Sequence, residues 1–298
     1  LDNIKLERPI RLGIDCGNGA AGIIAERVYK GLGCEVHSLY TEVDGNFPNH
    51  HPDPSKPENL TDLISLVKEK ELEVGLAFDG DADRLGVVSK EGKIIFPDMQ
   101  MILFSTSILE TNKNAKIVFD VKCSKLLPEA IEEEGGTAIM SKTGHSYIKE
   151  RMRQENALLG GEMSGHIFFN DRWPGFDDGV YAGARMLEII SNLSDERNIF
   201  KGLPELVSTS EINLATTDEE KFRIVEEFIS KANYENCTSI LIDGVRIESD
   251  TGWGLLRASN TSPNLVLRFE ADTKENLEII KNNFKKTLSD INPSLGDF

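Results

Sequence analysis

The chain has 298 residues, enough for two or three domains that each bury a core of their own. Its 33 basic and 50 acidic residues give a net charge of −17, which argues against a nucleic-acid partner because a polyanion would be repelled. Apolar runs stay shorter than the ~18 residues of a membrane span, and we expect no signal peptide. Four scattered cysteines without a C-x-x-C pair indicate free thiols, so we expect a cytoplasmic protein without a zinc site or a membrane partner.

The first third of the chain alternates predicted strands and helices. Residues 10–14 and 34–39 are typical of strands, and residues 20–32 carry apolar side chains at helical spacing. Four prolines fall within residues 44–57, which predicts a loop. A helix at 60–70 and a strand at 73–78 complete this unit.

Much of this unit recurs further along the chain. I-V-F-D at 117–120 resembles L-G-I-D at 12–15, an offset of 105 residues, and 136–141 resembles 33–38 at an offset of 103. Residues 158–162 resemble 76–79 at an offset near 83, which is smaller than the other two offsets. The difference is about the length of the proline-rich loop and its flanks. We infer two tandem α/β units of one design. Asp79 and Glu162 would then begin equivalent loops at the carboxyl ends of equivalent strands, where open sheets hold ligands.

The last third follows a different pattern. Five short strands are predicted at 211–215, 239–242, 245–248, 252–258 and 265–270, with a hairpin turn at Asp243-Gly244. Two helices, at about 219–231 and 274–288, complete an α+β domain. A polar stretch at 192–209 marks the boundary before it. The expected fold is thus two tandem α/β domains and a smaller α+β domain, over residues 1–93, 94–205 and 206–298.

The strongest chemical signal is the loop D-G-D-A-D-R at 79–84, which follows an apolar strand. Asp79, Asp81 and Asp83 offer three hard oxygen ligands in one turn, a set that suits Mg²⁺. An EF-hand would need Gly and Glu where Arg84 and Lys90 stand, so we reject it. The alternative is an acidic turn without a ligand, but three unpaired carboxylates at this spacing would repel one another.

A second loop, G-G-E-M-S-G-H at 160–166, combines glycines with Glu162, Ser164 and His166. Glycines allow close backbone approach, Glu and Ser bind sugar hydroxyls, and His moves protons near neutral pH. The alternative is a glycine turn before a strand at 167–170. Lys122 and His145 follow other strands and are supporting candidates at the same edge of the sheets.

A third loop, R-A-S-N-T-S-P at 257–263, lies between two predicted strands. Arg257, Ser259, Asn260 and Thr261, with Arg268 on the next strand, form a candidate anion cradle because guanidinium and hydroxyl groups bind phosphate oxygens. The alternative is a hairpin loop that happens to hold an arginine.

A fourth motif, G-N-G-A-A-G at 17–22, matches the dinucleotide-binding pattern G-x-G-x-x-G between a strand and a helix. A single match is weak, and we interpret it as a tight turn. A nucleotide-dependent oxidoreductase stays open as an alternative.

Three of these motifs, in this order, resemble the α-D-phosphohexomutase superfamily from about residue 8 to the C-terminus. The loop at 79–84 resembles its magnesium loop, G-E-M-S-G-H at 161–166 its sugar-recognition loop, and 257–263 its phosphate-binding loop. Glu-Met-Ser, F-P-N-H-H-P-D-P at 47–54 and K-T-G-H-S at 142–146 resemble the phosphomannomutase/phosphoglucomutase branch.

The resemblance implies four domains around a cleft, of which this chain would hold the second, third and fourth. The family's nucleophile is a phosphorylated serine in a T-A-S-H-N-P-like loop of the first domain, and no Ser-His dipeptide occurs here. We therefore expect a chain that lacks its first domain and is inactive alone. A non-catalytic sugar-phosphate-binding module is the alternative.

The resemblance also implies a reaction: reversible phosphoryl transfer between O6 and O1 of mannose or glucose phosphates, through a hexose 1,6-bisphosphate. The three Asp residues would hold Mg²⁺, and Glu162 and Ser164 would bind sugar hydroxyls. The 257–261 loop would hold the phosphate that is not reacting. Candidates for phosphate contact or proton transfer are Arg84, Lys122, His145 and His166, with His166 ranked first for proton transfer.

Overall fold

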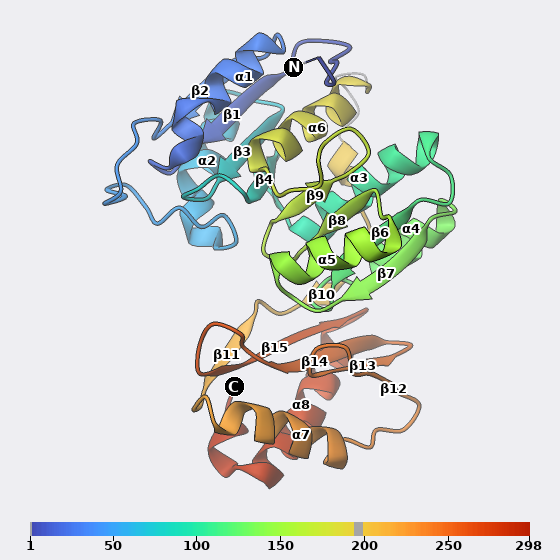
Figure 1. Ribbon diagram of the computed structural model, residues 1–298. Coiled ribbons are helices and arrows are strands. Elements are labelled where there is room, and N and C mark those ends of the chain that lie inside the picture. Colours follow the sequence, from blue (N-terminus) through green and yellow to red (C-terminus); the bar gives the residue numbers. More distant parts are fainter. Residues whose placement is uncertain (1, 194–198) are drawn as a thin grey trace. The chain divides into compact units, whose positions relative to one another are not determined.

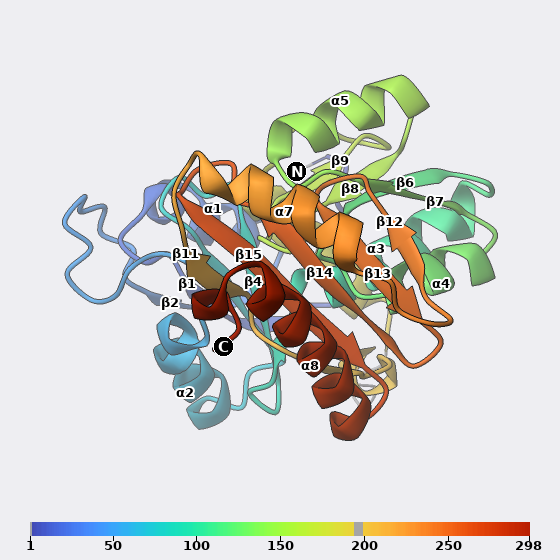
Figure 2. The same ribbon diagram turned by 90° about the horizontal axis from the view of Figure 1, so that it is seen from below.

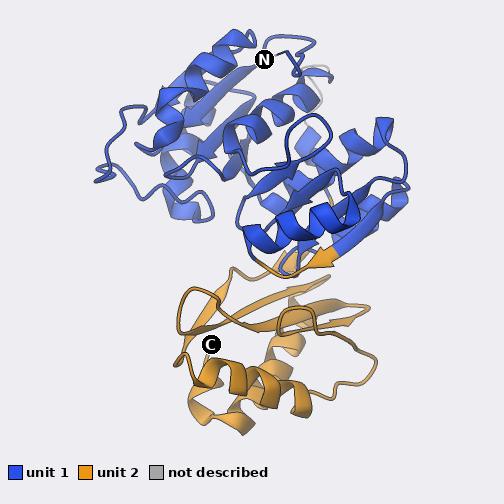
Figure 3. Cartoon of the chain, in the orientation of Figure 1, with its two compact units in different colours: residues 1–139, 144–203 blue, residues 140–143, 204–298 orange. Residues whose placement is uncertain are grey.

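The computed structural model describes residues 2–193 and 199–298, and its contacts divide the chain into two compact units (Figure 3). Unit 1 comprises Leu1–Ile139 and Gly144–Leu203, and unit 2 comprises Met140–Thr143 and Pro204–Phe298. Part of the predicted boundary stretch, residues 194–198, lies outside the described residues. The predicted boundary after residue 93 falls inside unit 1, and the domain limits 1–93, 94–205 and 206–298 stay predictions.

Unit 1 begins with a five-stranded sheet in the order β2-β1-β3-β4-β5 (Figure 1). β1 pairs in parallel with β2 and β3, while β3 pairs antiparallel with β4. β3 and β4 are buried along their whole length, as their apolar sequences require. The strands are β1 (Arg11–Asp15), β2 (Glu35–Leu39), β3 (Val74–Phe78), β4 (Leu85–Ser89) and β5 (Ile94–Ile95). Its helices are η1 (Ala20–Ile23), α1 (Ala25–Gly31), η2 (Pro57–Leu60) and α2 (Thr61–Glu69).

A second sheet, which lies in unit 1 except for the end of β7, repeats this topology in the order β7-β6-β8-β9. β6 is parallel to β8, and β8 is antiparallel to β9, just as β1, β3 and β4 are related in the first sheet. This equivalence confirms the tandem repeat predicted from the sequence offsets. The strands are β6 (Lys116–Asp120), β7 (Thr137–Ser141), β8 (Leu159–Gly161) and β9 (Ile167–Phe169), with helices α4 (Leu126–Glu133) and α5 (His145–Glu155).

The two sheets share helices. α3 (Pro97–Thr111) follows the first sheet along the chain, contacts its β4 and also packs on β8 of the second, while α6 (Gly179–Ser191) contacts β9 of the second sheet as well as β3 and β4 of the first. The Tyr29 hydroxyl of α1 donates to the Val180 carbonyl of α6 at 3.0 Å, and Tyr29 is fully buried. Each repeat thus completes the core of the other, which explains why both fall within one compact unit.

Gly183 on α6 lies at a closely packed point between the two repeats. A Cβ built there would collide with the Tyr29 hydroxyl and lie 3.1 Å from Leu76 Cδ1. Gly183→Val is expected to lower the free energy of unfolding by about 2 kcal/mol or more, because overpacking a buried contact displaces its neighbours. Urea unfolding measures this. Gly45→Val, where an added Cβ meets nothing within 4 Å, is the matched control. Equal stabilities of the two variants would contradict this packing account.

Unit 2 carries a six-stranded antiparallel sheet, with β10-β15-β14-β13-β12 as its main path and β11 paired with β15. Helices α7 and α8 lie on one face of it (Figure 2), where Phe228, Phe269 and Phe284 form the core. Ile240 pairs with Arg246 across the predicted Asp243-Gly244 turn. This confirms the α+β class. The strands are β10 (Val207–Ser208), β11 (Ile212–Ala215), β12 (Thr238–Ile240), β13 (Val245–Ser249), β14 (Gly252–Ala258) and β15 (Asn264–Ala271), and the helices are α7 (Glu220–Lys231), α8 (Lys274–Ile291) and η4 (Pro293–Leu295). The short helix η3 (Ile199–Gly202) precedes this unit and belongs to unit 1.

The helix predicted at 20–32 is the clearest local difference. Residues 20–23 form the 3₁₀ turn η1, and α1 begins only at Ala25. Gly22 lies so close to the Thr41 carbonyl that no side chain fits, and this contact holds the chain in the tighter turn. None of the described helices is long and apolar enough to span a membrane.

Candidate active site

The carboxylate loop joins β3 to β4. Asp79, Asp81 and Asp83 each offer an oxygen within 4.8 Å of the others. Ala82 adopts a positive φ of 67°, which turns the loop back on itself, and its carbonyl accepts a hydrogen bond from Gly179 N–H at 2.9 Å. The N-terminus of α6 therefore fixes the loop from the second repeat.

The charges of this loop are held by neighbouring cations. Arg84 Nε donates to Asp79 Oδ2 at 2.6 Å, and His166 Nε2 lies 3.2 Å from Asp83 Oδ1. Burial raises the pKa of Asp79 to about 6, although Arg84 opposes this shift. Burial also acts to raise the pKa of Asp83, but the contact with His166 outweighs it and the pKa falls below its usual value.

These residues fit a divalent cation. The donor set is three carboxylates, the ligand type that Mg²⁺ prefers. Asp83 Oδ1 is buried, and its 3.2 Å contact with His166 Nε2 lacks hydrogen-bond geometry. The Asp79 carboxylate is buried, burial raises its pKa, and a cation would offset the cost of the buried charge.

The glycine motif at 17–22 supports this loop. A Cβ at Gly19 would lie 2.7 Å from the Gly80 carbonyl, and Ala20 N–H donates to the same oxygen at 2.9 Å. Gly17 adopts a φ of 50°. The tight turn predicted here is confirmed, and the close packing accounts for the glycines without a dinucleotide.

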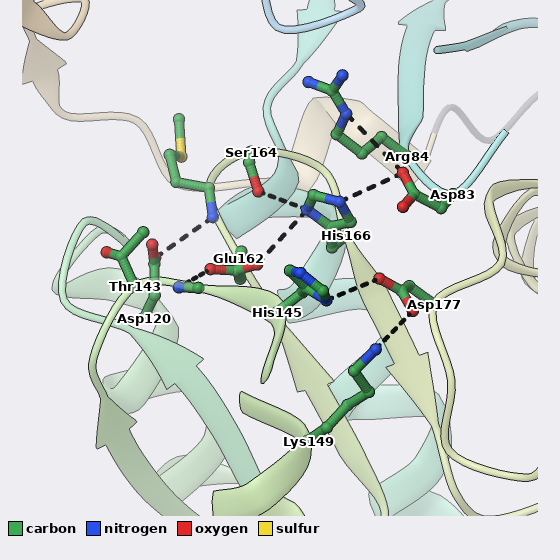
Figure 4. A network of polar contacts seen from close by, with 12 residues as sticks. Asp83, Arg84, Asp120, Thr143, His145, Lys149, Glu162, Ser164, His166 and Asp177 are labelled. Carbon is green, nitrogen blue, oxygen red and sulfur yellow. Dashed lines mark hydrogen bonds and ion pairs between the residues drawn. The ribbon is translucent and has the colours of Figure 1, made fainter. Parts of the chain in front are cut away.

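The two repeat-equivalent loops meet at the end of their strands. Arg84, just before β4, forms an antiparallel bridge with His166, just before β9, and Leu85 N–H donates to the Gly165 carbonyl at 3.1 Å. The sequence predicted that the loops were equivalent, and the structure brings them into direct contact (Figure 4). The carboxylate loop and the Glu162 loop consequently form one site.

Glu162, Ser164 and His166 form a connected group. Ser164 Oγ lies 2.9 Å from His166 Nδ1, and Glu162 Oε2 lies 3.4 Å from the same nitrogen. Glu162 is only 2% exposed, and its Oε1 accepts a hydrogen bond from Gly144 N–H. Burial, reinforced by the charge of Asp120, raises the pKa of Glu162 to about 7. Burial acts to lower the pKa of His166, but the contact with Asp83 dominates and raises it.

The two supporting candidates lie beside this group. His145 begins α5, and its ring stacks on His166 with centroids 5.9 Å apart. Lys122 follows β6 and is nearly buried, and its charge acts against the raised pKa of Glu162. Both therefore lie at the edge of the sheets where the sequence predicted them.

Three further acidic residues escaped the sequence reasoning. Asp120 is fully buried at the end of β6 and accepts a hydrogen bond from Met163 N–H at 3.3 Å. Asp177 contacts Lys149 at 3.3 Å and His145 at 4.0 Å. Asp15 ends β1 as Asp120 ends β6, so the 105-residue offset already contained the signal for both. No comparable pattern pointed to Asp177.

The predicted anion cradle lies in unit 2, in the loop between β14 and β15. Arg257 Nε donates to Asp243 Oδ2 at 2.8 Å, while its buried Nη2 has no hydrogen-bond partner among the described residues. Ser259 Oγ accepts from the Ser262 hydroxyl at 2.9 Å, and Asn260 and Thr261 are exposed. The guanidinium of Arg268 lies 5.8 Å from the Trp253 ring centre, and its strand pairs Arg268 with Leu255 rather than with Arg257.

Comparison with known proteins matches this arrangement along nearly the whole chain. Residues 2–92 match the model of phosphoglucomutase/phosphomannomutase alpha/beta/alpha domain II, 96–208 match domain III, and 211–287 match the C-terminal domain. The chain belongs to the phosphoglucomutase/phosphomannomutase family of the α-D-phosphohexomutase superfamily.

Individual relatives agree with this assignment. The chain is 55% identical to a phosphoglucomutase of Neisseria gonorrhoeae and 52% identical to a phosphomannomutase/phosphoglucomutase of Pseudomonas aeruginosa PAO1, with 98% and 99% of the chain aligned. It spans 64% of the length of each. A crystal structure of a phosphoglucomutase/phosphomannomutase family protein from Burkholderia thailandensis superposes with a TM-score of 0.93 at 48% identity, covering 98% of this chain and 63% of that one.

Proposed function

We propose that this chain forms the metal-, sugar- and phosphate-binding part of a phosphohexomutase that moves a phosphoryl group between O6 and O1 of mannose or glucose phosphates through a hexose 1,6-bisphosphate. The observation that carries the proposal is the meeting of two equivalent loops, one with three carboxylates and one with Glu162, at Arg84 and His166. The four free cysteines support a cytoplasmic location.

Different side chains of this chain would have different binding and catalytic roles. Glu162 and Ser164 would bind sugar hydroxyls, Glu162 because its raised pKa lets it donate as well as accept a hydrogen bond near neutral pH. His166 is the candidate for proton transfer, since it contacts both Ser164 and Asp83. Arg84, Lys122 and His145 would contact phosphate. In unit 2, Arg257, Ser259, Asn260 and Thr261 would hold the phosphate that is not reacting.

The cation would be Mg²⁺, held by Asp79, Asp81 and Asp83. When bound, it would offset the charge that develops in phosphoryl transfer. The phosphoryl donor in this proposal is the phosphoserine of the family's first domain, which none of the three matched models describes.

Arg257→Ala tests the phosphate-binding role of unit 2. The variant is expected to bind glucose 1-phosphate more weakly by about 1.5–3 kcal/mol, the value of a hydrogen bond to a charged group. Isothermal titration calorimetry measures the dissociation constant.

The matched control is Arg223→Ala, which removes an exposed arginine that pairs with Glu220 and Glu227 on the surface of α7. An unchanged dissociation constant in Arg257→Ala removes this residue from the site. Absence of glucose 1-phosphate and mannose 1-phosphate binding by the wild-type chain contradicts the proposed function.

A further inference from the structure

The proline-rich loop, residues 44–57, interrupts the first repeat, and the matching segment of the second repeat is shorter. One of its side chains reaches the candidate active site. Arg84 Nη1 lies 3.2 Å from Asp53 Oδ1, and the two side chains are only 26% and 19% exposed. Asp53 lies in the segment F-P-N-H-H-P-D-P at 47–54, which resembles the family branch, but none of the three binding loops predicted from the sequence includes it.

Two prolines hold Asp53 in place from both sides. Pro52 and Pro54 are buried, whereas Asp53 between them is only partly so. An added Cβ at Gly17 would lie 2.8 Å from Pro52 Cβ, and one at Gly86 would lie 2.7 Å from Pro54 Cβ. Each proline therefore packs against a glycine surface, one at the end of β1 and one on β4. Because Asp53 directly precedes Pro54, the proline ring also restricts the backbone conformation of Asp53.

Polar contacts tie down the rest of this loop. His50 Nε2 lies 3.0 Å from Oδ2 of the buried Asp15, which anchors the loop to the end of β1. Ser55 donates to Asp53 Oδ1 through its hydroxyl at 2.7 Å and its N–H at 3.1 Å. The Asp53 carboxylate is thus oriented before any ligand arrives.

The three nitrogens of the Arg84 guanidinium have different surroundings. Nε contacts Asp79 and Nη1 contacts Asp53, while Nη2 has no partner in the part of the chain that the structure describes. Asp79 belongs to the group of carboxylates that fits a cation, so a bound cation competes with Arg84 for it. Asp53 lies outside that group and stays available to the guanidinium.

We propose that Asp53 is a positioning residue: it holds the Arg84 guanidinium in one orientation, with Nη2 directed to a phosphate oxygen of the substrate. This inference rests on the proposed function, because it takes Arg84 as a phosphate contact. A guanidinium fixed before binding loses less side-chain entropy when it grips phosphate, which strengthens binding.

The test replaces Asp53 by asparagine, which keeps an acceptor for Ser55 but removes the charge that holds Arg84. Asp53→Asn is expected to bind glucose 1,6-bisphosphate about tenfold more weakly in calorimetry, with Mg²⁺ present. In an Arg84→Ala background the same change is expected to have no further effect, since its partner is gone. Asp44→Asn, in the same loop but bonded to Asn46, is the matched control.

A second measurement does not depend on the ligand. Exchange of the Arg84 Nη1 protons with solvent, followed by NMR, is expected to be faster in Asp53→Asn than in wild type and unchanged in Asp44→Asn, because Asp53 contacts Nη1. Unchanged exchange, or an equal loss of affinity with and without Arg84, would overturn the positioning role. Faster exchange in a chain that does not bind the bisphosphate would leave the positioning of Arg84 standing and refute the proposed function instead.

Discussion

Asp81→Asn is expected to weaken Mg²⁺ binding by about 100-fold or more, because losing even a partner outside the ligand shell costs about 10–100-fold. Asp81 is the exposed member of the three-carboxylate group, so its replacement leaves the buried contacts of Asp79 and Asp83 in place. The free energy of unfolding without metal should therefore stay within about 0.5 kcal/mol of wild type. Calorimetric titration with Mg²⁺ measures the affinity.

Glu58→Gln is the control for a simple change of charge. Glu58 is an exposed acid in the same unit, in the short helix η2. The Glu58→Gln variant should bind Mg²⁺ as the wild type does. If Asp81→Asn and Glu58→Gln reduce the affinity equally, Mg²⁺ is attracted by the net charge of the unit and the carboxylate loop is not its site.

Glu162→Gln is expected to stabilise the folded protein at pH 8 by roughly 2 kcal/mol while it weakens sugar-phosphate binding. The reason is the pKa of about 7 that burial and the charge of Asp120 impose on Glu162, against 4.5 for a free glutamic acid. Ionising this buried carboxyl costs free energy that the unfolded chain avoids. Glutamine keeps an acceptor for Gly144 N–H without the charge.

The direction of the pKa shift of Glu162 determines whether its contribution to stability rises or falls with pH. Between pH 4.5 and about 7 the folded state binds a proton at Glu162 that the unfolded state has lost, so this residue makes stability fall as pH rises through that range. Urea unfolding at several pH values should show a shallower decline in Glu162→Gln than in wild type. Glu129→Gln, an exposed change on α4, should reproduce the wild-type curve. A Glu162→Gln variant less stable than wild type at pH 8 contradicts this account.

A carboxylate kept at such a cost is typical of functional sites, where burial and neighbouring charges tune pKa values for chemistry. Glu162 and Asp79 both show this pattern, and they stand near the ends of equivalent strands. Each of the two equivalent loops thus carries one buried acid with a raised pKa. If the proposed function is right, one serves the cation and the other the sugar.

Many elements of the fold and of the candidate site could be predicted from the sequence, since the sequence signals for them are local. Strands and helices followed from periodicity over a few residues, and the tandem repeat followed from offsets between similar segments. Those offsets also predicted that the loops at Asp79 and Glu162 are equivalent, because the ends of equivalent strands occupy equivalent positions in a sheet. The residue types in each loop then indicated the chemistry.

Only the tertiary structure decided which of these parts touch. Several contacts join residues far apart in sequence: the packing of α3 and α6 on both sheets, the bridge from Arg84 to His166, and the contacts of Asp53 and His50. Periodicity does not encode such pairs, since their geometry depends on how whole elements pack. Two glycines show why. Gly17 was interpreted only as part of a tight turn and Gly86 carried no prediction, yet each admits a proline from a distant loop.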